Sequence, residues 1–418
     1  MKSVSLLVII GFFIGCATLK ISRTERALNR QIDDNPLLNK HFTGLTLFDP
    51  LTQEWLYERN ADRYFTPASN TKLLTLFAGI KILGDSIPAF KYGYRQDSLF
   101  FWGTGDPTFL HPDFMEQPAY DFLKQHEGPL LYVPNDMRSQ AFGPGWSWDD
   151  YAYSFQPERS AFPIYGNVVR INNGRIIPSI FEEFMFPDEL GSRRHPEMNL
   201  FTSPLIGSVD ETIPFKVYPE LSVQLLSDTL KRKVLIANRP DDFEVLYSRP
   251  TKSLYEIMMK RSDNFYAEQI LLLCSSLHSD NLFAENTMAY ISNNYFNDSN
   301  PPKWVDGSGL SRYNLVTPRF IVQLLHQLLN EKGQDWLFDV LPVGGVSGTI
   351  KNWYPGINQP FVYAKTGTLR NNHNLSGYLI TDTGRLLLFS FMNNNFTLSN
   401  SEIKTGMQQV LNFIRVNF

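Results

Sequence analysis

Ser69 and Lys72 are residues whose types and spacing could do covalent chemistry. Three positions apart on a helix, the two side chains share a face, so the lysine amine can reach the proton of the serine hydroxyl. A serine hydroxyl needs such a base before it can attack a carbonyl carbon. To accept the proton Lys72 must be neutral, which requires burial and the nearby positive charge of Lys365 to lower its pKa from the usual value of about 10.4. The pair predicts a serine nucleophile with a lysine base.

Two further motifs follow in the chain. Ser262-Asp263-Asn264 and Lys365-Thr366-Gly367 are each short enough to arise by chance, and an isolated Lys-Thr-Gly is usually a solvated strand end. Lys72 alone could be a surface lysine on an amphipathic helix, although it directly precedes Leu73 and Leu74. The occurrence of all three motifs in one order is far more specific and favours a catalytic interpretation.

The helix that carries Ser69 has clear start and stop signals. Thr66 is a suitable N-cap and Pro67 a suitable first helical residue. Apolar residues then recur at helical spacing until Gly84. We therefore expect Ser69 in the first turn of this helix.

Short apolar runs predict strands at both ends of the chain. Runs at 45–48 and 54–57 predict one hairpin, and runs at 374–380 and 385–392 predict another. From about 90 to 248 the pattern changes to short strands, Pro/Gly turns and aromatic clusters without a sustained helical period. This middle segment is predicted to be an inserted β-rich region.

Helical periodicity returns after the insertion. It begins at Leu254, breaks at Ser262-Asp263-Asn264 and resumes at Ala267, which puts Ser262 and Asn264 on a turn between two helices. Another helix is expected near 320–329. A final amphipathic helix is expected to carry Ile403, Met407, Val410, Leu411 and Ile414.

With these motifs the chain resembles the low-molecular-mass class C penicillin-binding proteins, the penicillin-binding protein 4 type. The resemblance extends over most of the chain after the N-terminal segment, and 193 positions separate Ser69 from Ser262, as expected for a family that inserts extra domains there. Four further segments look like family signatures: Gly103-Thr104-Gly105-Asp106-Pro107, Pro144-Gly145-Trp146, Asp306-Gly307-Ser308-Gly309-Leu310-Ser311-Arg312 and Lys365-Thr366-Gly367-Thr368-Leu369.

The resemblance implies an α+β fold. A β-lactamase/transpeptidase-like catalytic domain, an antiparallel sheet with flanking helices, is expected from residues 25–89 together with 249–418. Residues 90–248 are expected to interrupt it as one or two small β-rich domains.

The resemblance also implies roles for the motif residues. The catalytic residues would be Ser69, Lys72 and Ser262, with Ser262 relaying protons between Lys72 and the leaving group. Asp263 is expected to be a structural neighbour. Backbone N–H groups of Ser69 and Thr368 would hold the oxyanion.

Substrate binding is implied for the remaining motif positions. The Asn264 amide would bind the substrate backbone, and Lys365 with Thr366 would receive the terminal carboxylate. The strand that carries Thr368 would pair with the extended peptide along its edge. The expected binding residues are Asn264, Lys365, Thr366, Gly367 and Thr368.

The implied activity is that of a serine D-alanyl-D-alanine carboxypeptidase or endopeptidase. It would act on peptidoglycan stem peptides or cross-links through a Ser69 acyl-enzyme, and β-lactams would be covalent inhibitors. Both activities use the same serine, so the sequence leaves them open. A β-lactamase or esterase of the same fold is disfavoured because no convincing Glu-x-x-x-Asn element follows Asn264. A catalytically silent cell-wall-binding lipoprotein would not need the complete motif set.

Residues 1–16 predict a signal peptide with a lipobox-like end. Lys2 precedes an apolar run from Val4 to Ile14, which is shorter than the roughly 20 residues of a membrane-spanning helix. Cys16 then stands where a lipidated cysteine would, although Phe13 departs from the usual leucine. An ordinary cleaved signal or a short anchor is the alternative. We expect an exported, periplasmic protein that is lipid-anchored to a membrane through Cys16.

Charge and composition exclude several partners. The formal net charge is −4, with acidic and basic residues interleaved, so nucleic acid is not an expected partner. Cys16 and Cys274 are the two cysteines, and Cys274 lies in an apolar run that suggests a buried thiol. The 7 histidines show no metal-ligand spacing, so no metal or other cofactor is implied.

Three other features are left with a structural interpretation or an open role. The aromatic residues Trp146, Trp148, Tyr151 and Tyr153 could stack on a glycan or a stem peptide, but packing is favoured. The run from Asp306 to Gly309 is favoured as a Gly-rich turn without chemistry. Asp136 and Arg138 stand where the family carries charges that face the cleft, and their roles stay open.

Overall fold

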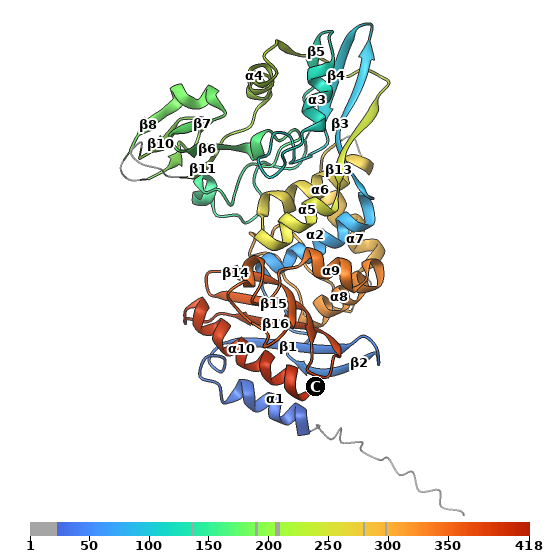
Figure 1. Ribbon diagram of the computed structural model, residues 1–418, viewed down its shortest axis with the longest axis vertical. Helices are drawn as coiled ribbons and strands as arrows, with labels where there is room; N and C mark the ends of the chain where they lie inside the picture. The colour runs from blue at the N-terminus through green and yellow to red at the C-terminus, as the bar shows by residue number, and fades with distance from the viewer. Residues whose placement is uncertain (1–22, 136, 189–190, 205–209, 279–280, 297–298) are drawn as a thin grey trace, which may run out of the picture.

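The computed structural model describes residues 23–418 of the chain, apart from 136, 189–190, 205–209, 279–280 and 297–298. The expected signal segment with Cys16, and also Asp136, therefore lie outside the described residues. Within the described part, no helix combines the length and the apolar character that crossing a membrane requires. The described chain is elongated, with the C-terminus towards the lower end in Figure 1.

A five-stranded antiparallel sheet unites the two ends of the chain (Figure 1). The strand order is β14-β15-β16-β1-β2, so β14 lies at one edge. Leu47 pairs with Phe389 across β1 and β16, which joins residues far apart in the sequence. Both expected hairpins are present. The strands are β1 (Phe42–Asp49), β2 (Glu54–Arg59), β14 (Val362–Leu369), β15 (Asn372–Ile380) and β16 (Leu386–Asn394).

Helices cover both faces of this sheet. Helices α1 (Arg23–Asp33) and α10 (Asn400–Asn417) pack together on one face, and their buried side chains share a core with β1, β15 and β16. Helix α8 (Pro318–Lys332) packs against β1 and β16 from the other side. Both faces of the central strands are therefore buried, which explains the unbroken apolar run at 386–389.

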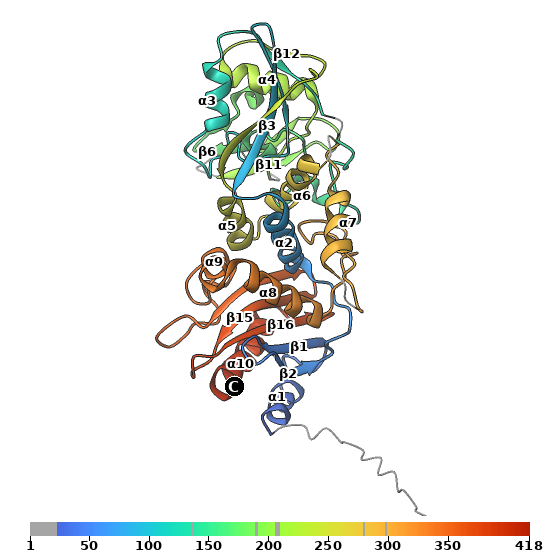
Figure 2. The same ribbon diagram turned by 90° about the vertical axis from the view of Figure 1, so that its right-hand side faces the viewer.

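A helical layer lies between the sheet and the inserted region (Figure 2). Helix α6 is buried over nearly its whole length, and its buried polar side chains are hydrogen-bonded, as Gln269 is to the Gly105 and Ser160 carbonyls. It packs against α2 and α7. The layer consists of α2 (Lys72–Ile82), α5 (Lys252–Arg261), α6 (Asn264–His278), α7 (Ala284–Tyr295) and α9 (Gln334–Val340).

The inserted region contains a second five-stranded sheet, with the order β12-β5-β4-β3-β13. Its first and last strands in the chain, β3 and β13, pair antiparallel, so the chain enters and leaves the region side by side. These strands are β3 (Ser86–Arg95), β4 (Ser98–Gly103), β5 (Leu130–Tyr132), β12 (Val234–Ile236) and β13 (Glu244–Pro250). Two three-stranded sheets complete it: β6 (Val168–Asn172), β7 (Arg175–Ile177) and β11 (Glu211–Pro214), and β8 (Met185–Pro187), β9 (Arg193–Arg194) and β10 (Phe201–Ser203).

The inserted region is less purely β than the sequence pattern suggested. Helices α3 (Pro118–Gln125) and α4 (Pro219–Leu230) both begin at a proline, which is a normal first helical residue. In α4 the buried residues Leu221, Leu225 and Leu226 do recur at helical spacing, but over only three turns. The expectation of no sustained helical period was therefore wrong at these two places.

The start of the Ser69 helix also differs from the expectation. Residues Ala68–Thr71 form a 3-10 turn, and the α-helix α2 begins only at Lys72. Thr66 does not cap it, because its backbone N–H and C=O instead bond to the side chains of Asn394 and Asn374. Hydrogen bonds from the sheet thus fix Thr66 in place of the N-cap that the local sequence predicted.

Candidate active site

Ser69 lies on the tight turn between the sheet and α2. Its Oγ is 3.0 Å from the Nζ of Lys72, as their spacing predicted. The sheet edge approaches this turn so closely that a Cβ on Gly367 would lie 2.2 Å from the carbonyl oxygen of Pro67. A glycine at 367 is therefore what allows β14 to lie beside the nucleophile.

Lys72 is fully buried and its Nζ has three oxygen neighbours. It donates to Asn264 Oδ1 at 2.7 Å and to the Ser308 carbonyl at 2.6 Å, and the third neighbour is Ser69 Oγ. A neutral amine has two N–H donors and one lone pair. When Nζ is protonated it can donate to all three oxygens; in the neutral form, donors to Asn264 and Ser308 would leave the lone pair for the Ser69 hydroxyl, which is the arrangement that a general base requires.

Burial lowers the pKa of Lys72 to about 8, while the carboxylates of Asp263, Asp306 and Glu268 oppose this shift. Burial also holds the pKa of Lys365 well below its usual value, and the charge of Lys72 lowers it further. The expected cause for Lys72 was thus only half correct, because burial and not Lys365 lowers its pKa. It is the charge of Lys72 that lowers the pKa of Lys365.

The Ser262-Asp263-Asn264 motif forms the turn between α5 and α6, as predicted. Ser262 has a left-handed backbone, with φ 60° and ψ 37°, which ends α5. Asp263 Oδ1 accepts a hydrogen bond from the Tyr266 N–H, so Asp263 stabilises the start of α6. The Asn264 Nδ2 donates to the Phe155 carbonyl at 2.9 Å, and this bond fixes the amide with its oxygen towards Lys72.

Lys365 lies on β14 and contacts the serine of the second motif. Its Nζ is 2.7 Å from Ser262 Oγ and 2.8 Å from the Thr366 carbonyl oxygen. Among the described residues, the lysine bonded to Ser262 is therefore Lys365 and not Lys72. The three motifs nevertheless meet at one place.

The open edge of β14 faces the site. The Ala364 N–H donates to the Pro342 carbonyl, on the side of β14 that lies away from β15. Because N–H groups alternate along a strand, those of Thr366 and Thr368 point to the same open side. This edge offers the donors that an extended peptide or an oxyanion would need.

The segment from Asp306 to Ser311 has a part in the site that the sequence did not indicate. The Ser308 carbonyl accepts from Lys72, and the Ser308 N–H donates to Glu268 Oε1 at 2.7 Å. Asp306 accepts from the N–H groups of Gly309 and Ser311, which fixes the turn. The segment is a turn, as predicted, and its contact with Lys72 could not be predicted from the sequence because every residue has a backbone carbonyl.

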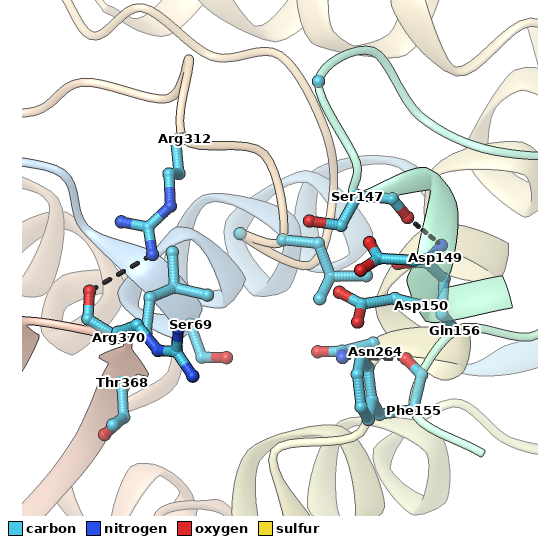
Figure 3. Close-up of a pocket in the computed structure, with 14 residues that line it drawn as sticks. Ser69, Ser147, Asp149, Asp150, Phe155, Gln156, Asn264, Arg312, Thr368 and Arg370 are labelled. Atoms are coloured by element: carbon cyan, nitrogen blue, oxygen red, sulfur yellow. Dashed lines mark hydrogen bonds between the residues drawn. The ribbon is translucent and has the colours of Figure 1, made fainter. Parts of the chain in front are cut away.

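A cleft of about 590 Å³ opens from Ser69 (Figure 3). Asp149 and Asp150, on the 3-10 turn Trp148–Ala152, lie on the side of Asn264. Arg312 and Arg370 lie on the side of Ser69 and Thr368, and Arg312 donates to the Arg370 carbonyl. The cleft thus has an acidic wall and a basic wall.

Of the four aromatic residues from Trp146 to Tyr153, two are packed against other side chains and two are exposed. Trp146 donates to Asp306 at 2.8 Å, and Tyr151 packs under Arg194, so these two are structural. Trp148 and Tyr153 are exposed. Arg138 is not among the residues that line the cleft, and its backbone N–H bonds to the Leu282 carbonyl.

The site has the features of a serine acyl-enzyme: a serine hydroxyl, a buried amine 3.0 Å from it and an open strand edge with N–H groups. Comparison with known proteins identifies the family within this class.

Residues 24–183 and 216–416 match the model of the D-Ala-D-Ala carboxypeptidase 3 (S13) family. The chain is 28% identical over 415 residues to the D-alanyl-D-alanine carboxypeptidase DacB of Haemophilus influenzae, covering 85% of this chain and 86% of that protein. It is 27% identical to the D-alanyl-D-alanine carboxypeptidase of Actinomadura sp. strain R39, covering 86% and 79%. The chain belongs to the D-Ala-D-Ala carboxypeptidase 3 (S13) family.

The fold has a solved counterpart. The crystal structure of penicillin binding protein 4 from Haemophilus influenzae matches with a TM-score of 0.73 at 20% identity, covering 94% of this chain and 98% of that one. The predicted α+β fold with a β-lactamase/transpeptidase-like domain is thereby confirmed. The chain is a serine-type D-Ala-D-Ala carboxypeptidase/endopeptidase, as the sequence predicted.

Proposed function

We propose that Ser69 is the nucleophile and Lys72 the base with which this enzyme cleaves the bond before a terminal D-alanine. The observation that carries the proposal is the environment of the buried Lys72 Nζ, which contacts Asn264 Oδ1, the Ser308 carbonyl and, at 3.0 Å, Ser69 Oγ, so that a neutral amine can bind the first two oxygens and take the proton from the third. Lys72 takes the proton as Oγ bonds to the carbonyl carbon. The N–H groups of Ser69 and Thr368 hold the oxyanion that forms.

Ser262 completes the first half of the reaction. Because Lys365 donates to Ser262 Oγ, the hydroxyl hydrogen of Ser262 is free to pass to the leaving nitrogen. The carbon–nitrogen bond then breaks, leaving an ester on Ser69 and a free D-alanine, and the proton that Lys72 took from Ser69 passes to the Ser262 oxygen, so that Lys72 is neutral again. Water then attacks the ester and gives a proton to Lys72, which returns it to Ser69 Oγ as the ester bond breaks and the shortened peptide leaves.

The substrate is a peptidoglycan stem peptide or cross-link. An extended peptide would pair with the open edge of β14, with the Asn264 side chain beside it. The acidic and basic walls of the cleft suit a peptide side chain that carries both an ammonium and a carboxylate group. β-Lactams would acylate Ser69 in the same way.

Export and lipid anchoring are part of the proposal. The apolar run that precedes Cys16 supports a lipoprotein signal, and a peptidoglycan enzyme must work outside the cytoplasm. We infer a periplasmic enzyme held to a membrane through Cys16. Cell fractionation tests this: wild type should stay with membranes, and Cys16→Ala should lose its lipid.

The first test is labelling with a fluorescent penicillin, read on a denaturing gel. The wild type and Ser253→Ala, which changes a serine outside the site, should both give a covalent band. Ser69→Ala should give none. A band of equal strength from Ser69→Ala would show that another residue is the nucleophile.

A further inference from the structure

A second cavity, of about 320 Å³, shares Ser69 with the main cleft. It is lined by Ser69, Ser262, Thr349, Thr366, Thr368 and Lys404. Among the described residues, Ser69 and Thr368 line both spaces, and the other lining residues differ. Since the main cleft can hold the acyl part of the substrate, the second cavity is placed to receive the leaving group.

Lys404 is a charged residue in this cavity that belongs to none of the three motifs. It comes from α10, at the far end of the sequence, and is half-buried. Its Nζ lies 5.2 Å from the centre of the Trp353 ring, and within the described residues no carboxylate lies within ion-pair distance. Burial lowers the pKa of Lys404, and no acidic neighbour opposes the shift. The cavity therefore contains a cation without a counter-ion.

Hydroxyl groups complete the lining. Thr349 Oγ1 and Thr366 Oγ1 are 2.7 Å apart, so one hydroxyl donates to the other and the second hydrogen remains available. Thr368 Oγ1 is 2.7 Å from His373 Nδ1. Burial lowers the pKa of His373 to about 3, so the ring is neutral.

The tautomer of His373 decides which way the Thr368 hydroxyl donates. The Nε2 of His373 is buried and has no hydrogen-bond partner among the residues that the structure describes. A buried N–H without an acceptor costs more free energy than a buried nitrogen lone pair without a donor. The ring proton of His373 therefore belongs on Nδ1, which donates to Thr368 Oγ1. The Thr368 hydroxyl hydrogen can then point into the cavity.

The contact with the substrate carboxylate was expected from Lys365, but the Nζ of Lys365 is already hydrogen-bonded within the protein. Its Nζ contacts Ser262 Oγ and the Thr366 carbonyl, and it does not line this cavity. Lys404 is the cation that the cavity presents.

We propose that Lys404, with the hydroxyls of Thr349, Thr366 and Thr368, forms a subsite for the carboxylate of the leaving residue. The proposal deepens the proposed function and rests on it. The subsite selects scissile bonds whose nitrogen belongs to a residue with a free α-carboxylate. A terminal D-alanine meets this condition, whereas a cross-link to a side-chain amine without a neighbouring carboxylate does not. Lys404 is thus a specificity-determining residue.

The test compares two N-acyl-D-alanyl thioesters whose leaving thiol carries either a carboxylate or a carboxamide. Thioesters are reactive enough for both to be measured. Lys404→Gln should lower kcat/KM for the carboxylate substrate by about 10- to 100-fold, the effect of losing a charge-assisted contact, and leave the carboxamide substrate within about twofold. Lys404→Arg should recover most of the loss.

The matched control is Lys351→Gln, which removes the same charge from an exposed lysine two residues from Thr349 and outside the cavity. It should change neither substrate. Equal losses on both substrates in Lys404→Gln, or no loss on either, would overturn the subsite. Complete penicillin labelling of Lys404→Gln after long incubation shows that the variant is folded. A wild type that cleaves neither thioester and takes no label would instead refute the proposed function.

Discussion

The chemistry of the site depends on how burial changes the pKa values of two lysine side chains. Lys72 and Lys365 are both fully buried, and the three carboxylates near Lys72 offset part of the cost of its charge. The pKa of Lys72 therefore falls to about 8, and burial holds that of Lys365 well below its usual value. A pKa of about 8 suits the general base that we propose Lys72 to be.

The rate of Ser69 acylation should follow the titration of Lys72. Burial lowers the pKa, so the neutral base forms as pH rises through about 8. Below that value the second-order rate constant for penicillin should rise about tenfold per pH unit, and above it the rate should level off. Stopped-flow acylation between pH 5.5 and 9.5 measures this. A flat profile would mean that Lys72 is neutral throughout or is not the base.

At the scale of elements, glycines set how closely the site's segments approach. Gly309 has a φ of +84°, and a Cβ there would lie 1.9 Å from the Ala68 carbonyl oxygen, next to the nucleophile. The neighbouring Ser308 carbonyl binds Lys72. The turn that contains Ser308 can contact Lys72 only because Gly309 has no side chain to separate it from the turn that contains Ser69.

Gly309→Ala should therefore reduce acylation strongly, by about 100-fold or more, because the turn and its Ser308 carbonyl must move away from Lys72. Gly384→Ala is a matched control, with a φ of +82° and open space around the new Cβ. Gly384→Ala should lose about 1–2 kcal/mol of stability from left-handed backbone strain, and Gly309→Ala should lose more, because its Cβ also meets the Ala68 carbonyl. Thermal unfolding and penicillin labelling separate the two effects. Equal activity in both would show that the close approach is unimportant.

At the scale of the whole molecule, the inserted region forms part of the active site. Phe155 holds the Asn264 amide, and Trp146 holds Asp306. Arg159 forms a buried ion pair with Glu268 of α6, at 3.4 Å. Glu268 in turn binds the Ser308 N–H beside Lys72. The insertion thus positions groups that contact Lys72 or its neighbours, the lysine that we propose as the base.

Arg159→Leu should destabilise the protein by about 3–5 kcal/mol, because it leaves the buried Glu268 without its partner. Arg193→Leu, which breaks an exposed pair with Asp188 at 3.6 Å, should cost less than about 1 kcal/mol. Chemical denaturation of the two variants gives the comparison. Similar losses would mean that the buried pair does not join the insertion to α6.

The domain bounds of 25–89 with 249–418, and 90–248 for the insertion, stay a prediction. Secondary structure was predicted best where local signals were strong, as at the two hairpins and the turn at Ser262. It was predicted least well where hydrogen bonds from distant residues override a local cap, as at Thr66. The short helix α4 has apolar residues at helical spacing. Its three helical turns are surrounded by short strands and loops, so the periodicity was too brief to predict a helix.

The class of reaction could be predicted along the chain, because Ser69, Lys72, Ser262 and Lys365, to which we assign the chemistry, belong to three short motifs in a distinctive order. What surrounds these residues could be seen only in the folded chain. Ser308 acts through a backbone carbonyl that every residue has, and Lys404 reaches the site from the last helix. Such contacts arise when distant segments pack together, and no spacing along the chain records them.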